Sequence, residues 1–298
     1  MEVNEPTTVD VLAVYVAGEL EHLEEQDRLL RDGEHEGVHQ LRVASRRIRS
    51  ALATYRPILD RDVSDPLREE LKWFGGTLSN ARDAQVQRKR LDTLVEREDD
   101  VLVLGPVRAR IDDELRSLFQ TELSRGLDVL DSERYSRLLD ALEAFVVDPP
   151  VTEDAAQPAR VTLPGLLRRD LKRLRRRHRA VHSAPDVHAR DEALHDVRKA
   201  AKRLRYAAEG ATPVLGGRST RLAAKAEAVQ DLLGELQDTV VSRTMLRQLG
   251  VTAHLSGENG FTFGRLHALQ QAQAEAQIEQ YAATYAALPR PRKVARWG

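Results

Sequence analysis

The chain has 298 residues, with 46 lysines and arginines against 47 aspartates and glutamates, and therefore a formal net charge of −1. It has no cysteine, which excludes disulfides and thiolate metal sites and fits a reducing cytoplasm. Aromatic residues make up 4%, and runs of β-branched residues are short. No stretch approaches the ~20 apolar residues of a membrane span, and the N-terminal MEVNEPTTVD lacks the features of a secretory signal. We therefore expect an all-α cytoplasmic protein without a membrane span.

The first half of the chain is predicted to be a series of helices. Thr7 and Asp10 have the spacing of a capping box at the start of the first helix. Pro57 ends the second helix, and Gly105-Pro106 opens the fourth. In chain order we expect helices at about 7–31, 38–56, 66–97, 106–130 and 132–147.

Residues 148–162, DPPVTEDAAQPARVT, are rich in proline, alanine and acid, and we interpret them as a linker between two halves, 8–147 and 163–288. The second half is predicted to contain helices at about 163–182, 188–210, 218–249 and 264–287. Residues 289–298 form a basic tail that we expect to be mobile.

Two helical elements occur twice. Residues 38–59, VHQLRVASRRIRSALATYRPIL, align without a gap to residues 194–215, LHDVRKAAKRLRYAAEGATPVL. A second pair, 67–91 and 222–246, shares leucines, an arginine and an aspartate. Because the same order of elements recurs, the sequence predicts an internally duplicated helical bundle.

Each copy of the first element carries four nitrogen-rich side chains on one helical face. A spacing of 3, 4 and 3 residues places them within an arc of about 80°, beside an apolar stripe. Neither face contains a carboxylate, although a merely solubilising face would mix both signs of charge. Arg47 and Arg203 fall outside both faces and are predicted to be solvated. The two basic stripes are His39, Arg42, Arg46 and Arg49, and His195, Arg198, Lys202 and Arg205.

Positive charge is concentrated although the whole chain is nearly neutral. Residues 166–182 hold eight lysines and arginines against one aspartate, and residues 38–61 hold six arginines against one aspartate. Such sorting is what an anion-binding site requires. A run like 168–179 is commonly a solvated face, but it contains almost no acid, which favours ligand binding. Opposite the core side of this helix, one arc groups Arg168, Lys172, Arg175 and Arg179.

Two residue pairs have alternative interpretations. His39 and His195 could be structural, but their recurrence on the basic stripes favours ligand contact. Asp83 and Asp238 could suggest acid–base catalysis. Beside arginines such as Arg82, they are better explained as supporting ion pairs that orient basic side chains or cap a buried arginine.

Together these residues resemble the CHAD family, histidine-containing α-helical domains that bind inorganic polyphosphate. The family pattern His-x-x-Arg-Val-x-x-Arg-Arg-x-Arg is matched from His39 to Arg49, and Leu-Gly-x-x-Arg-Asp-x-x-Val is matched by Leu78, Arg82, Asp83 and Val86 without its glycine. In the second half Gln237 replaces the arginine before Asp238. The resemblance covers about residues 8–288. It implies two four-helix bundles related by a pseudo-twofold axis, with a central basic channel between them.

The resemblance and the basic residues together predict non-catalytic binding of inorganic polyphosphate, without a cofactor or metal, in a cytoplasmic protein associated with polyphosphate granules. The chain has no Walker loop, HExxH or G-x-S-x-G motif. The alternatives are a binding module for RNA or single-stranded nucleic acid, which normally interleaves aromatic residues, and a granule-surface or protein-interaction scaffold. The predicted ligand contacts are His39, Arg42, Arg46, Arg49, Arg168, Lys172, Arg175, Arg179, His195, Arg198, Lys202 and Arg205.

Overall fold

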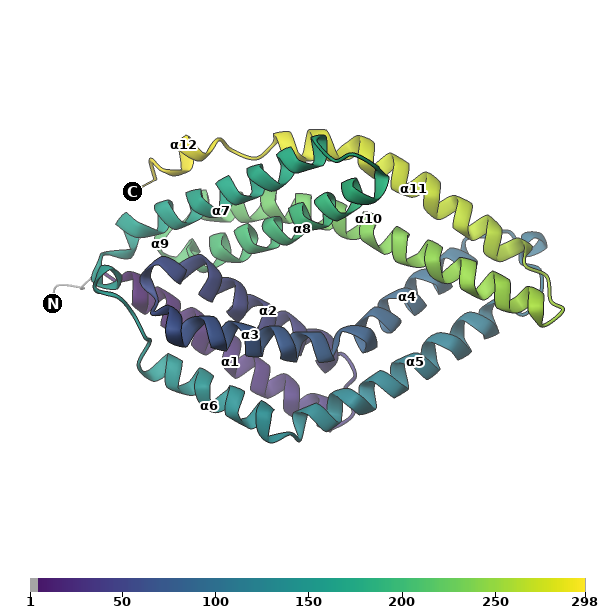
Figure 1. The fold of residues 1–298 in the computed structure, drawn as a ribbon, viewed down its shortest axis with the longest axis horizontal. Coiled ribbons are helices and arrows are strands. Elements are labelled where there is room, and N and C mark those ends of the chain that lie inside the picture. Colours follow the sequence, from purple (N-terminus) through teal and green to yellow (C-terminus); the bar gives the residue numbers. More distant parts are fainter. Residues whose placement is uncertain (1–4, 298) are drawn as a thin grey trace. The chain divides into compact units, whose positions relative to one another are not determined.

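A computed structural model describes residues 5–297 of the chain (Figure 1). Every regular element in this range is a helix, and the β contacts there are two isolated bridges, Thr7–Pro158 and Leu59–Val151. The all-α prediction is confirmed. Across the same residues, no helix combines the length and hydropathy that crossing a bilayer requires.

The chain forms two compact units, and each takes segments from both halves of the sequence. The first unit comprises the residues up to Thr77, Leu127–Gln230 and the residues from Thr284 onwards; the second comprises Leu78–Gly126 and Asp231–Ala283. The compact units therefore do not coincide with the sequence halves 8–147 and 163–288. The pseudo-twofold pair of bundles stays a prediction.

The first unit is built on amphipathic helices whose apolar faces were visible in the sequence. Leu41 and Ile48, Leu171 and Leu174, and Leu204 are all fully buried, as the helical spacing predicts. Within this unit α7 and α8 lie side by side, and α2 contacts α1, α3 and α8 (Figure 1). Its helices are α1 (Thr8–Arg31), α2 (Gly37–Tyr55), α3 (Arg61–Thr77), α6 (Glu133–Val147), α7 (Ala159–His182), α8 (Val187–Gly210), α9 (Thr212–Leu215) and α12 (Pro291–Val294), with the start of α10 (Gly217–Leu255).

The second unit has its own hydrophobic core. Leu91, Leu115, Leu246 and Phe263 are among the buried residues of one cluster. The helices around it are α4 (Ser79–Glu96), most of α5 (Val107–Leu130), the rest of α10, and most of α11 (Phe261–Ala286). The remaining regular elements among residues 5–297 are the short 3₁₀ helices η1 (Arg56–Ile58), η2 (Asp100–Leu102) and η3 (Glu153–Ala156).

Several helix boundaries differ from those predicted. The capping box of Thr7 and Asp10 is present as expected. The helix expected over 66–97 begins instead at Arg61 and is interrupted at Leu78, so that it forms α3 and α4. Helix α10 runs past Gly250 to Leu255. A Cβ on Gly250 would lie 3.2 Å from the Cβ of Phe263, so this glycine permits close packing and does not end the helix.

The segments predicted as linker and tail both belong to the first unit and contact its other elements. Thr152 donates its backbone N–H to the carbonyl of Ile58, and Ala159 donates to that of Pro6. The tail contains α12, which packs against α7 and buries Val294 completely. The tail that was expected to be mobile is therefore docked over residues 289–297, because its apolar side chains have a docking surface.

Candidate functional site

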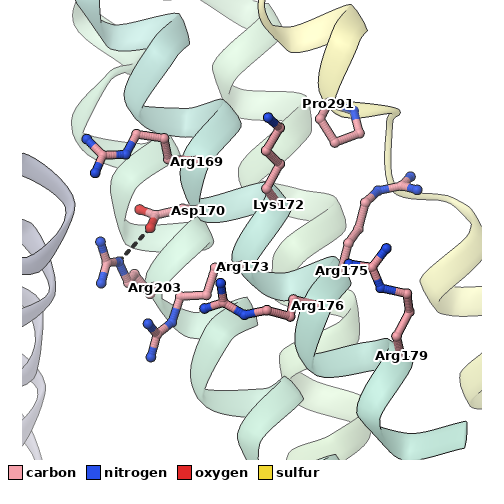
Figure 2. A pocket seen from close by; sticks show the side chains of 9 residues that line it. All are labelled: Arg169, Asp170, Lys172, Arg173, Arg175, Arg176, Arg179, Arg203 and Pro291. Atoms are coloured by element: carbon pink, nitrogen blue, oxygen red, sulfur yellow. Dashed lines mark ion pairs between the residues drawn. The ribbon is translucent and has the colours of Figure 1, made fainter.

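A pocket of about 600 Å³ in the first unit is lined almost entirely by cations (Figure 2). Helix α7 forms it because Leu163, Leu167, Leu171 and Leu174 bury one face, which leaves the arginine-rich face toward the pocket. The one carboxylate among the lining residues is that of Asp170. The lining cations are Arg169, Lys172, Arg173, Arg175, Arg176 and Arg179 of α7, and Arg203 of α8.

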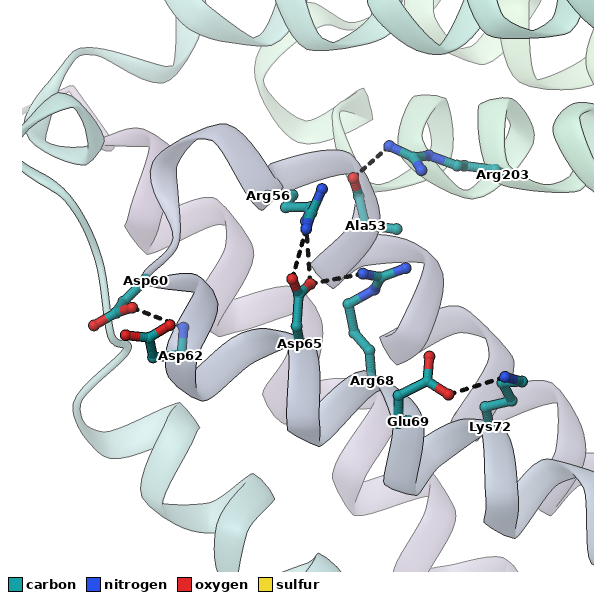
Figure 3. A network of polar contacts seen from close by, with 9 residues as sticks. All are labelled: Ala53, Arg56, Asp60, Asp62, Asp65, Arg68, Glu69, Lys72 and Arg203. Carbon is teal, nitrogen blue, oxygen red and sulfur yellow. Dashed lines mark hydrogen bonds and ion pairs between the residues drawn. The ribbon is translucent and has the colours of Figure 1, made fainter.

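Asp170 and Arg203 form a buried junction between three helices. The Asp170 side chain is 3% exposed, its Oδ1 lies 2.6 Å from Nε of Arg203, and its Oδ2 accepts a hydrogen bond of 2.6 Å from Oγ1 of Thr54 on α2. Arg203 also donates to the backbone carbonyl of Ala53 (Figure 3). Burial raises the pKa of the Asp170 carboxyl, and Arg203 and Thr54 oppose that rise. This junction fixes Arg203 at the pocket.

Like charges continue from the pocket onto α2 and α3. Burial lowers the pKa of Arg203, and the positive charges of Arg173 and Arg68 lower it further against the opposing effect of Asp170. Burial likewise lowers the pKa of Arg49, with added repulsion from Arg46 and Arg68. Arg68 on α3 is therefore within electrostatic range of both α2 and α8. Arg68 also pairs with Asp65 at 2.8 Å (Figure 3), and Glu69 opposes the lowering of the pKa of Arg49, so the positive charge on α2 and α3 is partly balanced within the protein.

The predicted α2 stripe lies along the partly buried side of that helix. His39, Arg42, Arg46 and Arg49 are all half-buried. Nε of Arg46 donates to the hydroxyl of Tyr206 on α8 at 3.1 Å, which ties the stripe to the neighbouring basic helix. Whether these side chains contact a ligand stays a prediction.

The α8 stripe divides into two parts. His195, Arg198 and Lys202 are half-buried, and Nδ1 of His195 is buried without a hydrogen-bond partner among the described residues. Burial lowers the pKa of His195, and the charges of Lys199 and Arg198 lower it further. Arg205 instead contacts two carboxylates, Glu209 at 2.6 Å and Glu227 at 2.9 Å. Its charge is thus already balanced within the protein.

Arg47 and Arg203, predicted to be solvated, are instead bound by acids. Arg47 lies 2.9 Å from Glu19 of α1 and 3.7 Å from Glu209 of α8, and Arg203 pairs with Asp170. The prediction considered each helix alone, whereas the packing of α2 against α1 and α8 turns these side chains inward.

The residues predicted to form one arc on α7 overlap only in part with the residues that line the pocket. Lys172, Arg175 and Arg179 line it, but Arg168 is not among the lining residues. Sequence analysis missed Arg169, Arg173, Arg176 and Arg203. The strong local excess of basic residues in α7 was a signal for the first three. Nothing in the sequence indicated that Arg203 reaches α7.

The residues predicted to form supporting ion pairs lie in the second unit. Asp83 is exposed, Asp238 is half-buried and accepts a hydrogen bond from Ser242 on its backbone carbonyl, and Arg82 donates to Gln85 at 3.3 Å. Their pairing with buried arginines stays a prediction. The buried acid that holds a pocket arginine is Asp170.

Among residues 5–297, no group of three or more histidines and carboxylates is arranged to hold a metal ion.

Comparison with known proteins identifies the family. The family model of the CHAD domain matches residues 14–247, most of the chain. The chain belongs to the CHAD family. The uncharacterized proteins Rv2226 and MT2285 of Mycobacterium tuberculosis (strains ATCC 25618 / H37Rv and CDC 1551 / Oshkosh) are each 38% identical to this CHAD domain over 283 residues, 94% of its length. It spans about half the length of these curated relatives, 53% in each case.

Two solved structures share the CHAD fold with this chain. PptA from Streptomyces chartreusis superposes with a TM-score of 0.77 at 24% identity, covering 94% of this chain and 100% of that one. The CHAD domain from the plant Ricinus communis gives a TM-score of 0.74 at 24% identity, covering 96% of this chain and 93% of that one. At this identity the likeness supports the all-α fold alone.

Proposed function

We propose that this CHAD domain binds inorganic polyphosphate without catalysing a reaction, and that the α7 pocket is the centre of the binding surface. The observation that carries the proposal is the set of seven lining cations with a single carboxylate, which is already paired with Arg203 and hydrogen-bonded by Thr54. A pocket of this charge favours a ligand with many negative charges and no need for apolar contact.

The chemistry of the lining fits linked phosphates. Guanidinium groups bind phosphate oxygens with two parallel hydrogen bonds, and lysine adds a compact point charge. Cations on successive turns of α7, such as Arg169, Arg173 and Arg176, are spaced along the helix at 1.5 Å per residue. A flexible polyanion can thus contact several turns at once, and a further contact becomes available at Arg49, whereas Arg68 is already paired with Asp65 at 2.8 Å. Each contact raises the effective concentration for the next one.

A binding role fits the single carboxylate better than acid–base chemistry does. A general base must lie within reach of its substrate, whereas the Asp170 side chain is 3% exposed and contacts Arg203 and Thr54. Phosphoryl transfer would in addition need acidic ligands for a metal beside the cations. The side chains that line the pocket supply positive charge in place of such groups.

We expect binding to depend strongly on salt and on the length of the ligand. A long polyphosphate should bind tightly at low salt, and its affinity should fall with a log–log slope of several units as salt rises, because each contact releases counterions. Pyrophosphate should bind weakly because it spans few cations. Isothermal titration calorimetry at three salt concentrations would measure both effects. An affinity that does not change with salt would contradict the ionic mechanism.

Competition distinguishes polyphosphate from nucleic acid. The pocket lining has no aromatic side chain on which bases could stack, so unlabelled RNA should displace labelled polyphosphate poorly at equal phosphate concentration. RNA displacing it equally well would favour the nucleic-acid alternative.

We further propose a cytoplasmic location on polyphosphate granules, which a fluorescent fusion of the full chain would test.

We expect affinity to rise as pH falls, mainly below pH 6.5. Burial and nearby cations lower the pKa of His195 from its ordinary value of 6.5, so the free protein carries a neutral imidazole at neutral pH. Polyphosphate favours the imidazolium, so binding takes up a proton and strengthens in acid. Titrations at pH 5.5 and 7.5 should differ several-fold, and His195→Gln should reduce that difference. An unchanged pH profile in this variant would exclude His195 from the site.

A further inference from the structure

We propose that the C-terminal strap, residues 288–297, is a clamp that completes the polyanion site on α7. This inference rests on the proposed function. The strap lies beyond the residues that match the family model, which end at 247. It was predicted to be a mobile tail, yet the structure places it at the rim of the basic pocket (Figure 2).

The strap is held at both ends and in the middle. Leu288 is 5% exposed and Val294 is fully buried. Nη2 of Arg175 donates a hydrogen bond of 3.1 Å to the carbonyl oxygen of Pro289, and Nη1 of Arg218 donates one of 3.4 Å to that of Trp297. Just before the strap, the ring of Tyr285 stacks on His178 of α7 with a centroid distance of 3.5 Å. These contacts fix the strap against α7, which supplies the pocket, and against the start of α10.

The exposed side chains of the strap extend the charge of the pocket. Pro291 is itself a lining residue, and Arg290 and Arg292 are its neighbours in the sequence. The strap contains no carboxylate. Its four basic residues, Arg290, Arg292, Lys293 and Arg296, are all exposed, whereas Leu288 and Val294 are buried.

Within these ten residues, buried side chains dock the strap and exposed side chains carry the positive charge, and this separation explains how the clamp acts. The apolar anchors and the hydrogen bond from Arg175 set the position of the strap, and the basic side chains then present a second row of cations to the ligand on α7. A polyanion held between two rows gains affinity through effective concentration, which a single row cannot supply. The pocket arginine Arg175 joins the two parts, because it lines the pocket and also holds the strap.

Two variants of the full chain separate the charge of the strap from its position. The triple variant Arg290→Gln, Arg292→Gln, Lys293→Gln keeps the anchors and removes three charges. Val294→Ser keeps every charge and weakens the docking. As a matched control, Arg28→Gln, Arg97→Gln, Lys225→Gln removes three exposed charges that do not line the pocket. Binding would be followed by fluorescence anisotropy of end-labelled long-chain polyphosphate at several salt concentrations.

We expect the strap triple variant to bind about tenfold more weakly or worse, and the slope of log affinity against log salt to fall by about two units, since each lost contact removes about 0.7. Val294→Ser should weaken binding several-fold and make the strap sensitive to protease, although its charge is unchanged. The control triple should change affinity less than about threefold.

The experiment distinguishes a failure of the clamp proposal from a failure of the proposed function. Wild-type protein that binds polyphosphate while the strap triple and the control triple behave alike would overturn the clamp and leave the proposed function intact. Wild-type protein that does not bind polyphosphate would overturn both. Normal affinity in Val294→Ser, with the strap shown by protease to be undocked, would also contradict the clamp, because position would then be irrelevant.

Discussion

Replacing Arg173, Arg176 and Arg179 together by glutamine is expected to weaken the binding of long-chain polyphosphate by about a hundredfold or more. All three line the pocket and are exposed. A hydrogen bond to a charged group contributes about 1.5–3 kcal/mol, and about 1.4 kcal/mol corresponds to a factor of ten in affinity. Three lost contacts therefore exceed two factors of ten. Calorimetric titration of the variant and the wild type would measure the loss.

The same variant should keep its fold, because exposed side chains typically change stability by no more than ~0.5 kcal/mol each. Its melting curve by circular dichroism checks this. A matched control removes three exposed arginines of the second unit, Arg88, Arg108 and Arg116, and should lower affinity less than about threefold. Equal losses in both triples would mean that binding follows net charge and has no preferred site.

Asp170→Ala is expected to have the largest effect on stability, a loss of about 3–5 kcal/mol in the free energy of unfolding. The substitution leaves Arg203 without its carboxylate beside Arg173 and Arg68, and leaves the Thr54 hydroxyl without its acceptor. Asp170→Asn should cost less, because the amide still offers an oxygen to Thr54. Urea unfolding of the two variants gives both values.

Asp83→Ala is the natural control for Asp170→Ala. The sequence suggested that Asp83 supports a buried arginine, but its side chain is exposed, so its removal should change stability by no more than ~0.5 kcal/mol. Comparable losses at the two positions would contradict the assignment of Asp170 as the buried partner that holds the pocket arginine.

The helices were predictable because their signals are local. The apolar spacing that marks Leu41, Ile48 and Leu52 as one buried face depends on helical geometry alone, and all three are fully buried. The interruption at Leu78 was missed because no proline stands there to mark it. At Gly250 the error was the opposite one: the glycine predicted a helix end, but the helix continues there. The missing side chain makes room for Phe263.

The site was only half predictable, because its members are brought together by packing. An excess of basic residues in α7 was visible in the sequence, as were three of its pocket residues, Lys172, Arg175 and Arg179. The roles of Arg47 and Arg203 were not, since a helical wheel shows which residues share a face but not which neighbouring helix covers it. Placing Asp170 opposite Arg203 required knowing that α7, α8 and α2 meet.

The account is tested most directly by a crystal structure of the full chain in complex with a polyphosphate of defined length. We predict a row of phosphates in the α7 pocket, with phosphate oxygens within hydrogen-bond distance of Arg173, Arg176 and Arg203. The polyphosphate should pass beneath the strap at Pro291. A polyphosphate chain bound on another surface, with the α7 pocket free of phosphate, would contradict the central claim.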